Sequence, residues 1–296
     1  MFAIDKNDPT KLTLVGKPAP VPAEFPSTVA ASAKNNLVCM GASGAKAGVA
    51  CANFDDKAGI GAFDDLREFD LKQTTPPVGP LNTVSQVFFS NDEETLFTTV
   101  KGDPTKNNTG FLSSFPVEVK GTGDSCVVNV AAKGEQKSPD GTAVLFGAQP
   151  VPYSSKIFST DASFGAVVLD VKDQANPQVL GKKEISGQKA TCWVAINHFT
   201  QSAFVTDVGT PRIIEMSLDD ASVLGELDMS NTGVGGLIDL KSSGKFVYAL
   251  APGDRNTKVM VLDVHEGMQK AKVIQQFDAS KFVGSSAQGM AILERQ

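Results

Sequence analysis

The sequence contains no long apolar run and no concentrated positive charge. None of its hydrophobic stretches approaches the roughly 20 apolar residues that a membrane-spanning helix needs. Its 27 Lys and Arg residues are outnumbered by 33 Asp and Glu residues, which gives a formal net charge of −6. Nucleic-acid binding requires a concentrated basic surface, and anionic membrane surfaces attract basic segments. We therefore predict no nucleic-acid partner and no membrane partner.

Histidine and tryptophan are scarce, and the common signatures of cofactor sites are missing. The 296 residues include two histidines, one tryptophan and four cysteines. No His or Cys cluster has the spacing of a zinc site, and no glycine-rich loop has a phosphate-binding pattern. A Gly-x-Ser-x-Gly nucleophile motif is absent as well. The sequence predicts no metal and no cofactor.

Turns between short apolar runs are abundant, as the 27 glycines and 16 prolines indicate. One pattern recurs five times: a short apolar run, a turn that contains glycine, and a second apolar run. The first runs begin at residues 37, 96, 157, 203 and 246, so the unit recurs every 43 to 61 residues. Repeats of about 40–50 residues with several short strands are typical of β-propeller blades. The runs lack the 3.6-residue periodicity of helices.

Each repeat also has a strand before the pair and one after it, which makes four strands per unit. The predicted first strands span residues 27–31, 84–88, 142–146, 191–195 and 236–240. We predict one all-β propeller domain over residues 1–296, built of four-stranded antiparallel blades.

The two ends of the chain do not complete this pattern. Five complete blades span about residues 24–283, and partial blades bring the total to about six blades' worth. Residues 1–4 and 12–15 are predicted as third and fourth strands, and residues 286–292 as a lone first strand. Because an open ring would leave unpaired strand edges, we expect the natural protein to begin before residue 1.

The residues Thr160–Val171 resemble the blade signature of the propeller lactonases, a family that includes 6-phosphogluconolactonase and the fungal 3-carboxymuconate cyclases. Residues 101–111, 141–147 and 188–193 resemble secreted fungal 3-carboxymuconate cyclase-like proteins in particular. The resemblance covers essentially the whole chain. It implies a seven-bladed propeller, a secretion signal that this chain does not include, and an isomerase or lactonase activity.

The four cysteines fall in two groups. Cys39 and Cys51 lie on the two arms of a hairpin centred near Ala45, where equal arms place them opposite each other. Cross-strand neighbours have Cβ atoms about 4.5–5.5 Å apart, which a small adjustment closes to disulfide distance. A Cys39–Cys51 disulfide and two buried free thiols are the alternatives, and we favour the disulfide. Cys126 and Cys192 are predicted to be free.

Asn107 begins the only Asn-x-Ser/Thr sequon, Asn107-Asn108-Thr109, in a polar loop where a glycan has space. Together with the hairpin cysteines and the family resemblance, this sequon favours a secreted glycoprotein, with attachment to a cell wall as one variant.

Candidate ligand-binding residues gather where inner strands begin and where second strands turn into third strands, because both places lie at one mouth of a propeller channel. The polar candidates at strand starts are Gln86, Thr191 and Gln288, and the cationic candidates in the loops are Lys101, Lys189, Arg212 and Arg255. Lys189 and Gln86 are the strongest of these. The alternative interpretation is that they are ordinary solvated loop residues.

Two other residue pairs admit a structural interpretation. Asp161 and Asp207 occupy equivalent positions in successive blades, where carboxylates could ligate Ca²⁺ or Mg²⁺. We favour the simpler interpretation that each caps its turn by hydrogen bonding to the backbone. His198 and His265 follow strands on the side opposite the channel mouth and are predicted to be surface residues.

The predicted function is a secreted carboxymuconate cyclase- or lactonase-like propeller that forms or opens lactones of small carboxylates as a monomer. Cyclisation needs an acid that protonates carbon and cations that bind carboxylates, whereas lactone hydrolysis needs an activated water. The sequence assigns no catalytic residue. The alternative is a non-catalytic extracellular antigen or ligand-binding propeller that retains the scaffold without the acid.

Overall fold

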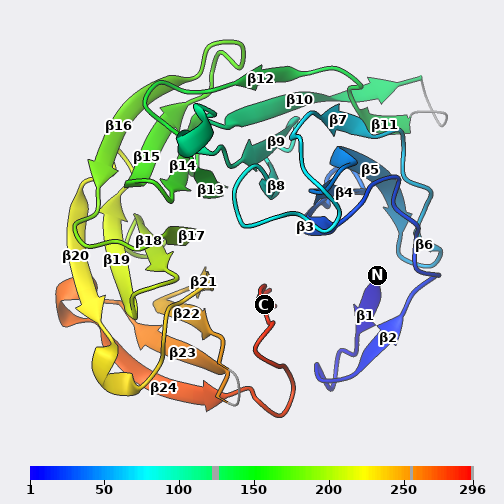
Figure 1. Cartoon of the computed structure of the whole chain (residues 1–296). Coiled ribbons are helices and arrows are strands. Elements are labelled where there is room, and N and C mark those ends of the chain that lie inside the picture. The colour runs from blue at the N-terminus through cyan, green and yellow to red at the C-terminus, as the bar shows by residue number, and fades with distance from the viewer. Residues whose placement is uncertain (122–126, 254–255, 295–296) are drawn as a thin grey trace. The chain divides into compact units, whose positions relative to one another are not determined.

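The computed structural model describes residues 1–121, 127–253 and 256–294, and its regular structure is almost entirely antiparallel β-sheet (Figure 1). The chain forms two compact units. Unit 1 comprises residues 1–106 and 110–137, and unit 2 comprises residues 107–109 and 138–296. The described helical turns are the 3₁₀ turns η1 (Pro104–Lys106), η3 (Ser230–Thr232) and η4 (Met268–Lys270). None of the helices in the described ranges has the length and apolarity needed to cross a bilayer.

Unit 1 contains one two-stranded sheet and two larger sheets. In the small sheet, β1 (Phe2–Ile4) pairs with β2 (Leu12–Leu14). The next sheet has the order β3-β4-β5-β6, with β7 also paired to β5: β3 (Pro26–Ser32), β4 (Leu37–Ala42), β5 (Ala47–Asp55), β6 (Gly59–Ile60) and β7 (Arg67–Phe69). The third has the order β8-β9-β10-β11, with β12 also paired to β10: β8 (Val84–Phe89), β9 (Thr95–Val100), β10 (Phe111–Lys120), β11 (Val127–Val130) and β12 (Glu135–Lys137).

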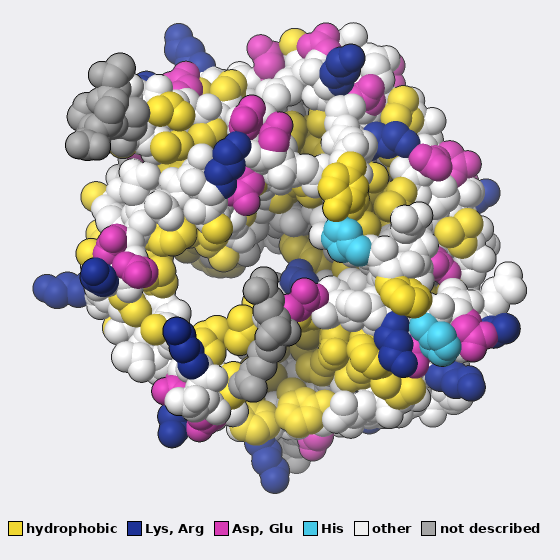
Figure 2. Space-filling view, turned by 180° about the vertical axis from the view of Figure 1, so that it is seen from behind, with side chains coloured by type: hydrophobic (Ala, Val, Ile, Leu, Met, Phe, Trp, Pro, Cys, Tyr) yellow, Lys and Arg dark blue, Asp and Glu magenta, His cyan; other side chains and the backbone are white. Residues whose placement is uncertain are grey.

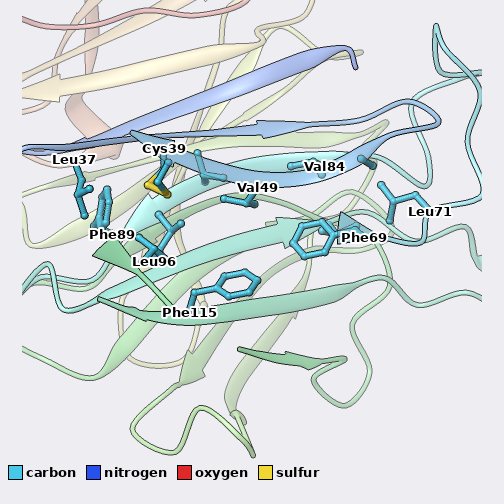
Figure 3. Close-up of a cluster of buried hydrophobic side chains, with 14 residues drawn as sticks. Leu37, Cys39, Val49, Phe69, Leu71, Val84, Phe89, Leu96 and Phe115 are labelled. Carbon is cyan, nitrogen blue, oxygen red and sulfur yellow. A yellow bond between two sulfur atoms is a disulfide. The ribbon is translucent and has the colours of Figure 1, made fainter. Parts of the chain in front are cut away.

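The core of unit 1 explains why its middle strands form where they do. Every residue of β4 and of β9 is buried, because a strand covered on both faces needs a continuous apolar run rather than an alternating one. Side chains from both larger sheets, including Val49, Leu96 and Phe115, meet in one cluster (Figure 3). Cys39 lies in this cluster and forms the predicted disulfide with Cys51, its direct cross-strand partner.

Unit 2 consists of three consecutive four-stranded antiparallel sheets, each with its strands in chain order. The first sheet contains β13 (Leu145–Pro150), β14 (Lys156–Asp161), β15 (Gly165–Asp170) and β16 (Gln178–Glu184). The second contains β17 (Thr191–Asn197), β18 (Ser202–Asp207), β19 (Arg212–Ser217) and β20 (Val223–Asp228). The third contains β21 (Asp239–Ser243), β22 (Phe246–Ala251), β23 (Lys258–Asp263) and β24 (Lys272–Asp278). The first strands β13, β17 and β21 lie side by side.

The structure corrects three strand predictions. The strands predicted at 142–146 and 236–240 begin three residues later, at Leu145 and Asp239. Before Leu145, the Asp161 carboxylate accepts the amides of Ala143 and Val144, and the Val144 carbonyl accepts the Ala162 amide in an isolated bridge. Residues 286–292, all of them described, form no strand. Within this segment, the Met290 amide donates a hydrogen bond to the Asp239 side chain of β21.

Both histidines are exposed, as predicted, and Figure 2 shows both at the surface of the face in view. His265 lies between two carboxylates: its Nδ1 is 2.7 Å from Asp263, and its Nε2 is 3.2 Å from Glu266. His265 follows the last residue of β23, Asp263, and so lies at the opposite end of that strand from its first residue, Lys258.

Candidate functional site

The predicted ligand-binding residues of unit 1 are half-buried and interact with other residues of the protein. Gln86 lies within β8, and Lys101 follows β9 directly. Both take part in interactions within the protein. Arg255 lies outside the described residues, as does Cys126. Asn107, the sequon asparagine, is exposed.

In unit 2, Lys189 lies just before β17 and Thr191 is its first residue, and the two differ in burial and in hydrogen bonding. Thr191 is buried, and both its amide and its hydroxyl donate to the Gln188 side chain. Lys189 is exposed, and its amide donates to Asp207 at 2.9 Å. Its side-chain stem covers Gly209, where a Cβ atom would stand 2.5 Å from the Lys189 Cβ. Lys189 thus keeps a solvated ammonium, whereas Thr191 is occupied by its own turn.

Arg212, at the start of β19, is buried, and its guanidinium connects several segments of the chain. Its guanidinium lies 3.7 Å from Asp207 and 3.2 Å from Glu226, and it donates to the Ser186 carbonyl at 3.0 Å. A guanidinium with this many internal partners joins neighbouring segments of the blade. Gln288, by contrast, is exposed in the segment that follows β24.

The turn-cap interpretation of the two repeated aspartates is confirmed. The Asp161 carboxylate accepts hydrogen bonds from the amides of Ala143, Val144 and Ser163. Asp207 accepts the amides of Lys189, Ala190 and Gly209. Backbone donors therefore fill the oxygens that a cation would use. Within the described parts of the chain, no cluster of His, Cys, Asp and Glu has a metal-binding arrangement.

A row of half-buried side chains crosses the first strands of unit 2. Phe146 on β13 meets Trp193 on β17 edge to face, with ring centroids 5.8 Å apart. The Lys241 ammonium of β21 lies 5.4 Å from the Trp193 ring centroid, within the distance of a cation–π interaction. Phe146 and Trp193 are flanked by buried residues in their strands, whereas Lys241 is followed by the half-buried Ser242 and Ser243.

Asp239 adds a buried carboxyl to this row. Its side chain is 3% exposed, and its Oδ1 lies 3.3 Å from the Lys241 ammonium. The Met290 amide donates to its other oxygen at 2.6 Å. Burial raises the pKa of the Asp239 carboxyl above its ordinary value, while the Lys241 charge and the Met290 hydrogen bond oppose part of that rise. A carboxyl perturbed by burial next to a specific cation is a recognised mark of functional sites.

These four residues, which we call the Trp193 row (Phe146, Trp193, Asp239 and Lys241), combine three chemical functions. The aromatic rings offer a flat apolar surface, Lys241 offers a charge for an anion, and Asp239 offers a proton acceptor or donor. The pairing of Asp239 with Lys241 could have been predicted from the sequence. Asp239 and Lys241 are two residues apart on one strand, so their side chains point to the same face. An acid inside the apolar run Leu237–Leu240 is unusual unless it has a partner.

Consecutive four-stranded antiparallel blades with adjacent first strands define the fold class as a β-propeller. No protein-family model matches the chain, and no curated protein sequence matches it. Solved structures do. A protein from Bacteroides uniformis ATCC 8492, described as a candidate 6-phosphogluconolactonase, matches with a TM-score of 0.66 and 16% identity, over 94% of this chain and 77% of that chain.

Two further structures show the breadth of this likeness. The periplasmic gluconolactonase of Pseudomonas aeruginosa matches with a TM-score of 0.64 and 13% identity, over 94% of this chain and 78% of its own. A structure of a nidogen/laminin complex matches with a TM-score of 0.56 and 14% identity, over 95% of this chain and 89% of that chain. The chain therefore shares the fold of lactonase-like propellers, and this fold also serves proteins that form complexes.

Proposed function

We propose that the protein binds a small cyclic or unsaturated carboxylate at the Trp193 row and forms or opens its lactone. The observation that carries this proposal is the buried Asp239 carboxyl, which lies 3.3 Å from the ammonium of Lys241, itself over the Trp193 ring. The shared fold of the two lactonase-like structures supports the reaction class, as an analogy of fold. The residues Lys189, Gln86, Thr191, Gln288, Lys101, Arg212 and Arg255 remain proposed contributors to ligand binding.

Lactone opening assigns one task to each side chain. The substrate ring stacks on Trp193, and Lys241 binds its carboxylate or the oxygen that becomes negative in the transition state. Ionised Asp239 takes a proton from water as the water oxygen attacks the lactone carbonyl carbon. The ring C–O bond then breaks, and Asp239 returns the proton to the leaving oxygen. Water and lactone thus become a hydroxy acid.

Cyclisation of 3-carboxymuconate uses the same groups in the other protonation state. A carboxylate oxygen of the substrate forms a bond to an alkene carbon, and the adjacent carbon accepts a proton. Protonated Asp239 supplies that proton, and solvent restores it afterwards. Because burial raises the Asp239 pKa, a larger fraction of the carboxyl is protonated near neutral pH than for an exposed aspartate.

The test is an ultraviolet assay of 3-carboxymuconate consumption beside a panel of lactones. If the chain is catalytic, Asp239→Asn lowers kcat by about a hundredfold or more, as expected for loss of a general acid–base group. Lys241→Met raises KM more than it lowers kcat, because the ammonium binds the carboxylate in ground and transition states. Lys245→Met removes an exposed lysine from the same blade and is the matched control, expected to leave both constants unchanged.

A non-catalytic ligand-binding propeller is the second candidate function. It is favoured by the Met290 amide, which occupies one Asp239 oxygen, and by the fold's occurrence in a nidogen/laminin complex. Because Trp193 is the only tryptophan of the chain, its fluorescence reports binding at the row directly. Saturable quenching without turnover would support the binding protein. No turnover and no quenching with any carboxylate or lactone would refute a ligand site at the row.

We also propose an extracellular location for this protein. The Cys39–Cys51 disulfide is compatible with an oxidising compartment, and the exposed Asn107 sequon offers a glycan acceptor. Expression through a eukaryotic secretory pathway should yield a protein whose mass falls on treatment with peptide N-glycosidase. Asn107→Gln should abolish that change. Free thiols at Cys39 and Cys51 in protein from its native source would contradict secretion.

A further inference from the structure

Unit 1 contains an apolar groove of about 550 Å³. One wall is the segment Lys17–Pro22, which joins β2 to β3, and the other is the segment 60–63, which leads from β6 toward β7. Small-molecule sites usually enclose about 300–1,000 Å³ and are mostly apolar with a few polar groups. The groove has this size and composition.

Proline explains why the two walls stay apart. Pro18, Pro20 and Pro22 occupy alternate positions, and none of them has an N–H group to donate. A strand that lacks every second donor cannot pair with a neighbouring backbone along that edge. The segment is therefore unable to close onto residues 60–63 as an additional strand, and the space between them remains open.

Both walls are fixed before any ligand arrives. Before the groove, Gly16 lies so close to the turn of β5 and β6 that an added Cβ atom would stand 2.2 Å from the Ala58 carbonyl oxygen. After the groove, the Glu24 amide donates to the Lys46 carbonyl at 3.1 Å. Within it, Val21 and Phe63 pack against the buried cluster around Met40. A preformed site loses little conformational entropy when it binds.

Charge selects the kind of ligand. Lys17 is the one charged residue among those that line the groove. Its side chain is exposed and has no ion-pair partner among the residues that the structure describes. An ammonium at the end of an apolar groove favours a molecule with an apolar body and a single anionic end.

We propose that this groove binds a free amphipathic monocarboxylate, with its hydrocarbon body between the proline wall and Phe63 and its carboxylate on Lys17. The groove belongs to unit 1, whereas the Trp193 row belongs to unit 2. The proposal is thus independent of the proposed function, and each has its own readout.

The test is calorimetric titration of the full chain with decanoate below its micelle concentration, with decanol as the uncharged analogue. We expect saturable binding of decanoate and binding of decanol that is about tenfold weaker, which corresponds to about 1.4 kcal/mol. Lys17→Met should weaken decanoate to the level of decanol. Lys11→Met, which removes an exposed lysine of the same region, should change nothing.

A steric variant and a labelling experiment complete the test. Ala62→Trp fills the groove and should abolish binding, whereas Ala33→Trp, at an exposed turn, should not. A photoreactive decanoate analogue should label residues 17–22 or 60–63 of the unmodified chain, which does not depend on the folding of any variant. Labelling elsewhere, equal affinities for decanoate and decanol, or no saturable binding of decanoate would overturn the proposal.

Discussion

The hairpins β4–β5 of unit 1 and β14–β15 of unit 2 each end on a pair that contains a glycine of the same backbone geometry, and different chemistry holds each hairpin. At equivalent places in the register, Ala42 pairs with Gly48 and Asp161 pairs with Gly165. Both glycines have a φ close to +150°, and an added Cβ atom would stand within 2.5 Å of a carbonyl oxygen of the neighbouring strand. A disulfide joins the two arms of the β4–β5 hairpin, whereas the Asp161 carboxylate caps the turn of the β14–β15 hairpin.

The difference lies in what each device connects. The Cys39–Cys51 disulfide joins only the two arms of its hairpin. The Asp161 carboxylate accepts the Ser163 amide in its own turn and also the amides of Ala143 and Val144, which lead into β13. The aspartate thus fastens the hairpin to the first strand of its blade. Repeated carboxylates in a propeller are therefore explained by backbone capping before any metal is invoked.

Removing the carboxylate should have the largest effect on stability. Asp161 is fully buried, so Asp161→Ala leaves the amides of Ala143, Val144 and Ser163 without this acceptor, and that of Val144 is buried. We expect the free energy of unfolding to fall by about 3–4 kcal/mol, measured by urea denaturation. Ser163→Ala, which removes a single donor to the same carboxylate, is the control. Equal losses from both variants would show that the connection to β13 contributes nothing.

Removing the disulfide should have a smaller effect. Cys39 and Cys51 are separated by 12 residues, and closing a short loop restricts the unfolded chain by an amount worth about 2–3 kcal/mol. We expect the double variant Cys39→Ala, Cys51→Ala to lose that amount in urea denaturation. Cys192→Ala, at a buried free cysteine, removes packing without a cross-link. If reducing agent does not lower the stability of the unmodified chain, the cross-link is not what stabilises this hairpin.

The third prediction concerns Asp239. Its buried carboxyl lowers the stability of the fold when it is ionised, whereas the Asp161 carboxyl raises stability. The pKa of Asp239 is raised in the folded protein, so the folded state binds more protons than the unfolded state between pH 3.8 and that raised pKa. Stability attributable to this group therefore falls as the pH rises through this window. Asp239→Asn abolishes the titration and should gain stability relative to the unmodified chain over the same window. A constant difference between the two proteins at every pH would contradict the raised pKa.

The repeat was readable from the sequence because the second strand of each large sheet is mostly buried and therefore mostly apolar. The runs that begin at residues 37, 96, 157, 203 and 246 all lie in second strands of the structure. The cross-strand disulfide was predictable because a symmetric hairpin fixes which residues of its two strands face each other. The strand starts at Leu145 and Asp239 were not predictable from propensity. The Asp161 carboxylate binds the amides of residues 143 and 144, and the Leu237 amide donates to the Asp207 carbonyl instead of to β22.

The candidate site was harder to predict than the fold. Trp193 and Lys241 are 48 positions apart in the printed sequence, and each looks like an ordinary strand residue. They become neighbours only because the first strands of successive blades lie side by side. Arg212, selected by its loop position, forms a buried ion pair with Asp207 and a more exposed one with Glu226 in the same blade.

The sequence by itself determined the strand repeat, the hairpin that carries the disulfide and the roles of Asp161 and Asp207 as turn caps. These properties are local, because they depend on residues near one another in the chain and on the two-residue period of a strand. The tertiary structure alone decided the raised pKa of Asp239 and the assembly of the Trp193 row. Both depend on burial and on contacts between segments far apart in sequence, and neither leaves a periodic trace in the chain.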